Sequence, residues 1–145
     1  MISRKSVLKL IVGLALLPAF LSTSKQETPK LWAAISVSDP LFEEGWTKEL
    51  MIHFTLVNDG TTTIDPKVGT WKLVVNGEEL ADSGFIFGNG IRDTRWEALP
   101  TGDKLRFTYA LEQYFKKPGI YRVSWKGDGF ETLPIEFRVM PNKKN

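Results

Sequence analysis

Cysteine is absent from this sequence, and histidine occurs once, at His53. A chain without thiols has no disulfide, no cysteine-ligated metal site and no cysteine nucleophile. A single histidine, lying between Ile52 and Phe54, has no marked partners for a catalytic triad or a histidine-rich metal site. We therefore predict no catalytic residues, no metal site and no cofactor, and we interpret His53 as a surface or inter-strand side chain.

Carboxylate pairs and glycine-rich stretches occur, but not in the patterns that enzymes use. The adjacent glutamates at 43–44 and 78–79 would point to opposite faces of a strand, so they cannot flank a sugar-cleaving cleft together. A phosphate loop needs a helix directly after its glycines, and we predict none after residues 88–90 or 127–129. The sequence thus predicts a protein that is not an enzyme.

The net charge is small once the N-terminus is set aside, because acidic and basic residues nearly balance. The net charge is +2, and Arg4, Lys5 and Lys9 supply three positive charges in the first 24 residues, which include no acid, so the rest of the chain is near −1. Nucleic-acid binding needs a clustered basic face, which this composition lacks. We expect no nucleic-acid partner.

The first 24 residues resemble a secretory signal peptide. A basic start leads into the apolar run 10–21, and small polar residues follow at 22–24. The run is shorter than the roughly 20 apolar residues of a membrane span. We expect cleavage after Ser24 and a secreted or periplasmic protein with no membrane contact afterwards; the alternative is an uncleaved N-terminal anchor.

The remaining chain has the length of one domain. Residues 25–30 are polar and predict a flexible tether, residues 31–140 predict the folded domain, and residues 141–145 a C-terminal tail. Apolar and polar side chains alternate with a period of two in segments 33–38, 50–57, 71–75, 104–111, 121–126 and 133–140, and segment 78–87 continues a strand with irregular alternation.

These seven segments predict an all-β domain. Asn76-Gly77 predicts a type I′ hairpin turn, residues 127–129 a second hairpin, and residues 112–117 a helical turn. Because each strand has one apolar face, two packed antiparallel sheets bury them directly. We predict an immunoglobulin-like antiparallel β-sandwich of about seven strands, with a small barrel as the alternative, and an open sheet edge at 133–140.

One segment resembles the start of strand F in immunoglobulin-like and fibronectin-like domains. It reads KPGIYRVSW over residues 117–125, and the resemblance implies that the Tyr121 hydroxyl bonds back to the upstream backbone. Val123 stands where antibody domains have their second cysteine, and Trp71 takes the place of the strand C tryptophan. The resemblance is therefore to the sandwich and not to antibody domains.

A broader pattern joins VNDG (57–60), WKLVVNGEEL (71–80), LPTG (99–102) and PGIY (118–121). It is similar to exported bacterial immunoglobulin-like modules of unknown function, and loosely similar to the bacterial intracellular proteinase inhibitor family. These are turn and corner residues, so the resemblance implies a fold and transfers no functional residue.

Two aromatic segments are candidates for binding. Residues 84–99 hold Arg92, Arg95 and Trp96 together, and interfaces are enriched in tryptophan and arginine. Trp46, in the loop after the first strand, is the second candidate and could stack on a sugar. The alternatives are that Trp96 caps one end of the sandwich while the arginines pair with Asp93 and Glu97, and that Trp46 folds over the core edge.

We accordingly expect a non-catalytic exported binding or accessory domain, whose partner is a protein or a polysaccharide outside the cytoplasm. One alternative is an inhibitor that inserts residues 84–99 into a hydrolase. The other is a carbohydrate-binding module.

Overall fold

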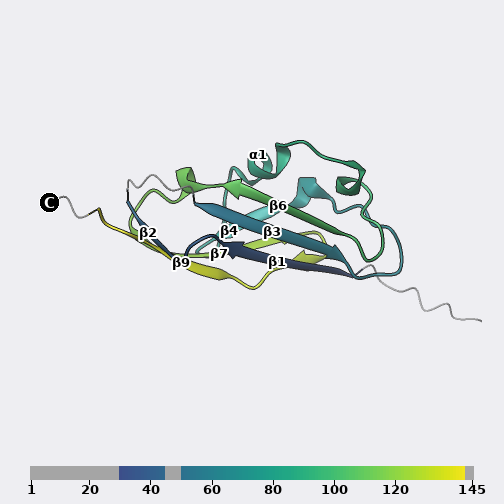
Figure 1. Ribbon diagram of the computed structural model, residues 1–145, viewed down its shortest axis with the longest axis horizontal. Helices are drawn as coiled ribbons and strands as arrows, with labels where there is room; N and C mark the ends of the chain where they lie inside the picture. The colour runs from purple at the N-terminus through teal and green to yellow at the C-terminus, as the bar shows by residue number, and fades with distance from the viewer. Residues whose placement is uncertain (1–29, 45–49, 143–145) are drawn as a thin grey trace, which may run out of the picture.

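The computed structural model describes residues 30–44 and 50–142, which form two β-sheets (Figure 1). Strands make up 46% of these described residues, which include one short α-helix, consistent with a β-sandwich. Within the described residues no helix is both long and apolar enough to cross a membrane. The predicted signal peptide, its cleavage site and Trp46 lie outside the described residues.

The first sheet has three antiparallel strands in the order β1-β3-β6. They are β1 (Leu31–Val37), β3 (Met51–Asn58) and β6 (Lys104–Ala110). The register sets Ile35 beside Phe54, and Phe54 beside Phe107. Side chains on alternate positions of β3 are buried, as the period-two pattern predicts.

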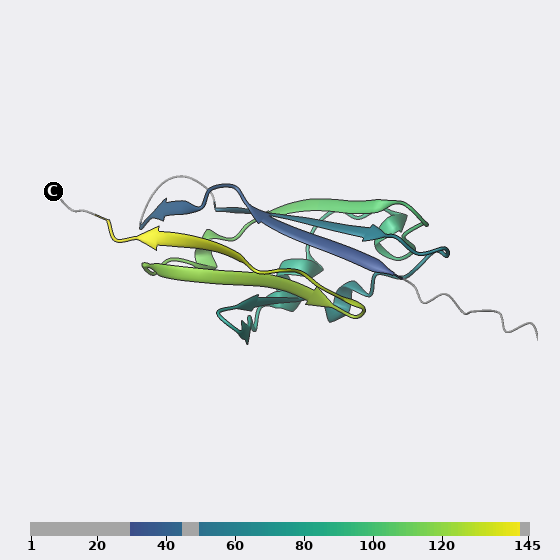
Figure 2. The ribbon, with the colours of Figure 1, turned by 90° about the horizontal axis from the view of Figure 1, so that it is seen from below.

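The second sheet has six strands in the order β2-β9-β7-β4-β5, with β8 paired to β7. They are β2 (Leu41–Glu43), β4 (Lys72–Val75), β5 (Glu78–Glu79), β7 (Gly119–Gly127), β8 (Phe130–Glu131) and β9 (Ile135–Met140). Figure 2 shows the two sheets as separate layers. Strand β1 belongs to the first sheet, whereas β2 pairs with β9 of the second. The chain crosses between them at Asp39-Pro40, and β2 then runs parallel to β9.

Aromatic rings fill the space between the sheets. Trp125 is fully buried and meets Trp71 edge-on, with ring centroids 4.9 Å apart. Phe54 and Phe107 stack with ring centroids 5.0 Å apart, and the Phe87 ring meets Phe54 edge-on. Burying rings of this size contributes about 1.5–3 kcal/mol each, which lets a chain without disulfides hold its fold.

The predicted turns are confirmed. Asn76 and Gly77 both have positive φ, 51° and 87°, as a type I′ turn requires. Residues 127–129 join β7 to β8, and a 3-10 helix, η3 (Glu112–Tyr114), lies inside the predicted helical turn. These features depend on a few neighbouring residues, so the local sequence is enough to predict them.

Buried Asn58 connects the turn at residues 57–60 with the turn at residues 99–102. Its side-chain amide donates to the carbonyls of Thr62 and Leu99 at 2.8 and 2.9 Å, and its Oδ1 accepts from the Gly60 amide. Every polar atom of this side chain is therefore satisfied, as burial requires.

The predicted strand at 78–87 is wrong beyond Glu79. Residues 83–88 form a helix, α1 (Ser83–Gly88), in which Ser83, Ile86 and Phe87 are buried. Their spacing of i, i+3 and i+4 places them on one helical face. The Ser83 hydroxyl accepts from the Leu73 amide and donates to the Leu80 carbonyl, which takes up a ladder group of β4 and ends the strand pairing there.

The open edge predicted at 133–140 is also wrong. Strand β9 lies between β2 and β7 and is hydrogen-bonded to both. The count of about seven strands omitted the short β2 and β8, because runs of two or three residues carry no readable alternation.

Candidate functional site

The candidate site lies on the long connection from β5 to β6. This connection holds α1 and the 3-10 helix η2 (Thr94–Trp96), and in Figure 1 α1 lies on the β6 side of the molecule. It includes three of the four residues predicted to bind, Arg92, Arg95 and Trp96.

Helix α1 is anchored by its buried face. The Phe87 ring meets Trp71 and Phe54 edge-on, with centroids 5.6 and 5.4 Å apart. The opposite face is different, because Phe85 is 70% exposed and Ile91, just beyond the helix, is fully exposed. Two large apolar side chains are thus held in solvent by a segment whose other side is fixed in the core.

Arg92 and Trp96 lie together. The Arg92 guanidinium carbon stands 5.0 Å from the centroid of the Trp96 ring, and its Nη2 donates to the Phe87 carbonyl. Trp96 is half-buried against Phe107 and Trp71, with centroids 4.9 and 5.8 Å away. The arginine therefore bridges the end of α1 and η2.

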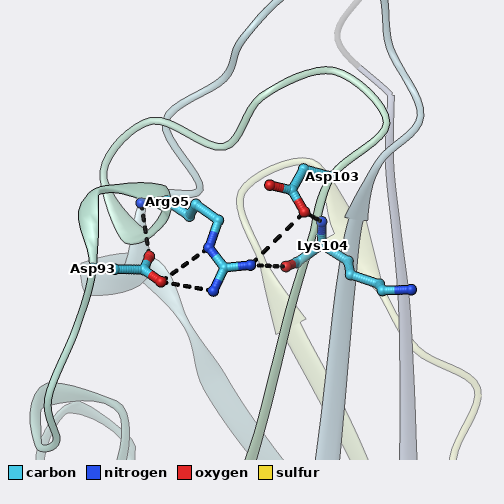
Figure 3. A network of polar contacts seen from close by, with 4 residues as sticks. All are labelled: Asp93, Arg95, Asp103 and Lys104. Atoms are coloured by element: carbon cyan, nitrogen blue, oxygen red, sulfur yellow. Dashed lines mark hydrogen bonds and ion pairs between the residues drawn. The ribbon is translucent and has the colours of Figure 1, made fainter.

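Arg95 is committed to contacts within its own loop (Figure 3). Its Nη2 is 2.6 Å and its Nε 3.0 Å from Asp93 Oδ2, and the Asp93 Oδ1 accepts from the Arg95 amide at 2.9 Å. Its Nη1 donates to the Lys104 carbonyl and lies 3.8 Å from Asp103. The side-chain hydrogen bonds of this ion pair lower the pKa of Asp93 and raise the pKa of Arg95.

The C-terminal end of α1 is tied to β6. The Tyr109 hydroxyl donates to the backbone carbonyl of Asn89 at 3.1 Å, and the side-chain Nδ2 of Asn89 donates to the Phe85 carbonyl at 2.9 Å. Burial raises the pKa of Tyr109, and the nearby charge of Arg92 partly offsets this. The hydroxyl is therefore a neutral donor at physiological pH, and the loop that presents Ile91 is held on both sides.

A groove of about 450 Å³ runs beside Trp96. Residues of both signs line it, among them Arg92, Asp93 and Glu97 on one side and Asp65 and Lys67 on the other. Within the described residues no three His, Cys, Asp or Glu side chains gather closely enough to hold a metal ion. The groove is therefore lined by charges of both signs.

Sequence reasoning located the segment but missed its exposed apolar side chains. Phe85 was assigned to a strand, whereas the helical spacing of Ser83, Ile86 and Phe87 was the signal that puts it on the outer face. Of the two arginines, Arg95 pairs with Asp93, and Arg92 contacts Trp96 and the Phe87 carbonyl.

His53 lies on β3, where its Nδ1 is 2.8 Å from the Thr108 hydroxyl on β6, directly across the strand pair. Both residues are on the exposed side of the sheet, so this contact is a cross-strand pair.

Comparison with known proteins gives no family for this chain. No family model matches it, and no curated protein matches it in sequence. The resemblances to sandwich modules and to proteinase inhibitors are therefore supported only by the sequence motifs described above.

Proposed function

We propose that this chain is a non-catalytic, exported binding domain of the immunoglobulin-like type, and that residues 85–96 are its contact surface for a protein. Export is inferred from the basic and apolar residues that open the sequence. The observation that carries the binding proposal is the full exposure of Ile91, beside exposed Phe85, on a segment anchored to the core.

The strand order supports the immunoglobulin-like assignment. Strands β1, β3 and β6 correspond to A, B and E, and β9, β7, β4 and β5 correspond to G, F, C and C′. The segment with α1 and η2 stands where the fourth strand of the first sheet, D, is found in those domains.

Two side chains add to this assignment. The Tyr121 hydroxyl donates to the Lys117 carbonyl at 2.8 Å, which is the hydrogen bond of a tyrosine corner. Trp71, at the start of the C-like strand, is buried between the sheets. Both contacts are those that the resemblance implied.

The contact surface is apolar at its tip and rigid at its base. Holding Phe85 and Ile91 in water is unfavourable unless a partner covers them, because burying a side chain of this size stabilises by about 1.5–3 kcal/mol. The hydrogen bonds of Asn89, Tyr109 and Arg92 fix the loop beforehand, so little entropy is lost on binding.

A sugar ligand is less well supported at this surface. Stacking on a sugar needs an open aromatic face, whereas the Trp96 ring packs against Phe107 and lies under the Arg92 guanidinium. An inhibitor would use the same segment, with Ile91 as the side chain that enters a hydrolase. The identity of the captured partner separates that alternative from a general binding module.

Site-specific photocrosslinking tests the proposal. The host that produces the protein would express the full chain with a benzophenone amino acid in place of Ile91, and a control chain with the same group in place of exposed Glu78 on β5. We expect one discrete protein adduct from position 91 and none from position 78.

A second variant ties the adduct to the surface. Adding Phe85→Ser should reduce the position 91 adduct about tenfold, since it removes a neighbouring apolar contact, while far-ultraviolet circular dichroism shows an unchanged fold. The proposal is wrong if position 91 yields no adduct, or if both positions capture the same proteins equally. A polysaccharide adduct would favour the carbohydrate-binding alternative instead.

A further inference from the structure

Strand β1 is a long sheet edge without the usual protection. It spans seven residues, LWAAISV, with no charge and no proline, and within the described residues no strand pairs with its outer side. Natural proteins blunt such edges, because unpaired amides and carbonyls in a row bind other strands. Strand β1 is therefore long, uncharged and unpaired on its outer side, which are the properties of a strand-pairing surface.

The other sheet edges are short or covered. Strands β5 and β8 have two residues each, and β2 has three. The edge of β6 is approached by the β5–β6 connection, since Arg95 donates to the Lys104 carbonyl and Tyr109 donates to the Asn89 carbonyl. Of the sheet edges that the structure describes, β1 is therefore the one open to another strand.

Hydrogen bonding to β3 determines which groups of β1 face outward. The Ser38 amide donates to the Met51 carbonyl, and the Lys30 carbonyl accepts from the Asp59 amide. In an antiparallel ladder such residues alternate, so even-numbered residues bond to β3. The amides and carbonyls of the odd-numbered residues consequently point away from the sheet; they are Leu31, Ala33, Ile35 and Val37.

We propose that a second copy of this chain pairs with β1 in antiparallel fashion, with Ala34 opposite Ala34 of the second copy. This register aligns all seven residues and sets odd residues opposite odd residues, Leu31 against Val37 and Ala33 against Ile35. Each such pair exchanges two backbone hydrogen bonds. Shifting the register by one residue would place inward side chains opposite outward ones, which the pleat forbids.

Side-chain size and charge favour a second copy over an unrelated strand. The small Ala34 sits at the two-fold axis, and exposed Trp32 falls opposite the small Ser36 of the second copy. Antiparallel pairing also brings the basic end of one strand, at Lys30, beside the acidic end of the other, at Asp39. Large residues thus meet small ones and opposite charges meet at both ends.

The surroundings of β1 supply apolar surface for the second copy to cover. A groove of about 360 Å³ lies between residues 31–35 and residues 130–135. Trp32 is 54% exposed and Leu133 is 87% exposed at its rim. Pairing through one seven-residue strand with this apolar rim makes a small interface, so we expect a weak dimer with a dissociation constant on the order of 10 μM.

Introducing a charge at position 34, on the two-fold axis, tests the dimer. Sedimentation equilibrium on protein recovered from cells expressing the full chain should show a concentration-dependent dimer. Ala34→Lys and Ala34→Glu should each weaken it at least about tenfold, because like charges then face each other. An equimolar mixture of the two variants should dimerise again. Thr55→Glu, one strand inward on β3 and opposite Arg106, is the matched control and should dimerise normally.

The absence of cysteine allows the register itself to be tested. At a non-hydrogen-bonded antiparallel pair the two Cα atoms lie about 4.5 Å apart, within disulfide range. Ala34→Cys should therefore form a disulfide-linked dimer on mild oxidation, whereas Ser36→Cys should not, because its two copies would lie roughly 13 Å apart. A monomer at all concentrations, a dimer indifferent to both charge variants, or equal crosslinking at 34 and 36 would overturn the proposal.

Discussion

Two buried tryptophans differ in one hydrogen bond, and that difference predicts a difference in stability. Trp71 and Trp125 are both fully buried and in contact with each other. The Trp71 Nε1 donates to the carbonyl of buried Pro66 at 2.9 Å, whereas the Trp125 Nε1 has no hydrogen-bond partner among the described residues. Replacing either tryptophan by phenylalanine removes a similar volume. Only at position 71 does the replacement also remove a hydrogen bond.

The magnitude follows from the cost of an unpaired buried group. Trp71→Phe leaves the Pro66 carbonyl without its donor, which costs about 1–3 kcal/mol. Trp125→Phe removes a donor that is already unsatisfied, so it returns part of that cost. With the volume loss common to both, Trp71→Phe should be the more destabilising by about 2 kcal/mol. That gap corresponds to about 8 °C in Tm for a domain of this size.

Urea unfolding followed by circular dichroism near 215 nm measures the gap, because the β-sheet backbone dominates the signal at that wavelength. Equal slopes of free energy against urea would show that both variants unfold from a comparable native state. The two single variants are compared with wild type and not combined, because residues in contact are not additive. Equal losses of stability would refute the reasoning and would mean that a neighbouring ring satisfies the Trp125 Nε1 as well as a carbonyl does.

Two further predictions concern single positions. A Cβ on Gly127 would lie 2.6 Å from ring atoms of Trp71 and Phe130, so Gly127→Ala should lower the free energy of unfolding by about 1–3 kcal/mol, measured by thermal unfolding. Gly69→Ala is the control and should lower it little, because the space around Gly69 is open. Equal effects of the two substitutions would contradict the packing argument. Burial raises the pKa of Tyr109 above its ordinary value of 10.0, so stability from its neutral form is complete below pH 10 and is lost as pH rises through the folded-state value. Absorbance at 295 nm should therefore show a tyrosine that titrates late and disappears in Tyr109→Phe; an unchanged titration in that variant would exclude Tyr109 as its source.

The candidate site was only partly predictable. Composition located the segment, because Arg92, Arg95 and Trp96 lie within five residues of one another. The same sequence did not show which groups each arginine contacts. That depends on the Lys104 carbonyl and Asp103, which the fold brings beside Arg95, and on the tilt of the Trp96 ring.

The free edge at β1 was beyond sequence reasoning for a similar reason. Alternation shows that a segment is a strand, but not which neighbours it has. The final strand was expected at the edge and lies inside its sheet, because three residues after Pro40 return to pair with it. Edge and centre are properties of pairing between distant segments.

By itself the sequence determined what each short stretch of backbone can do. Period-two alternation predicted the long strands, and Asn76-Gly77 predicted a turn that needs two positive φ angles, since both depend on adjacent residues. The tertiary structure decided everything that requires distant partners: the end of the β4 ladder at the Ser83 hydroxyl, the parallel pairing of β2 with β9, and the exposure of Phe85, Ile91 and the edge of β1. A hydrogen bond or a packed ring forms only where the fold supplies its second member, and that member can lie a hundred residues away.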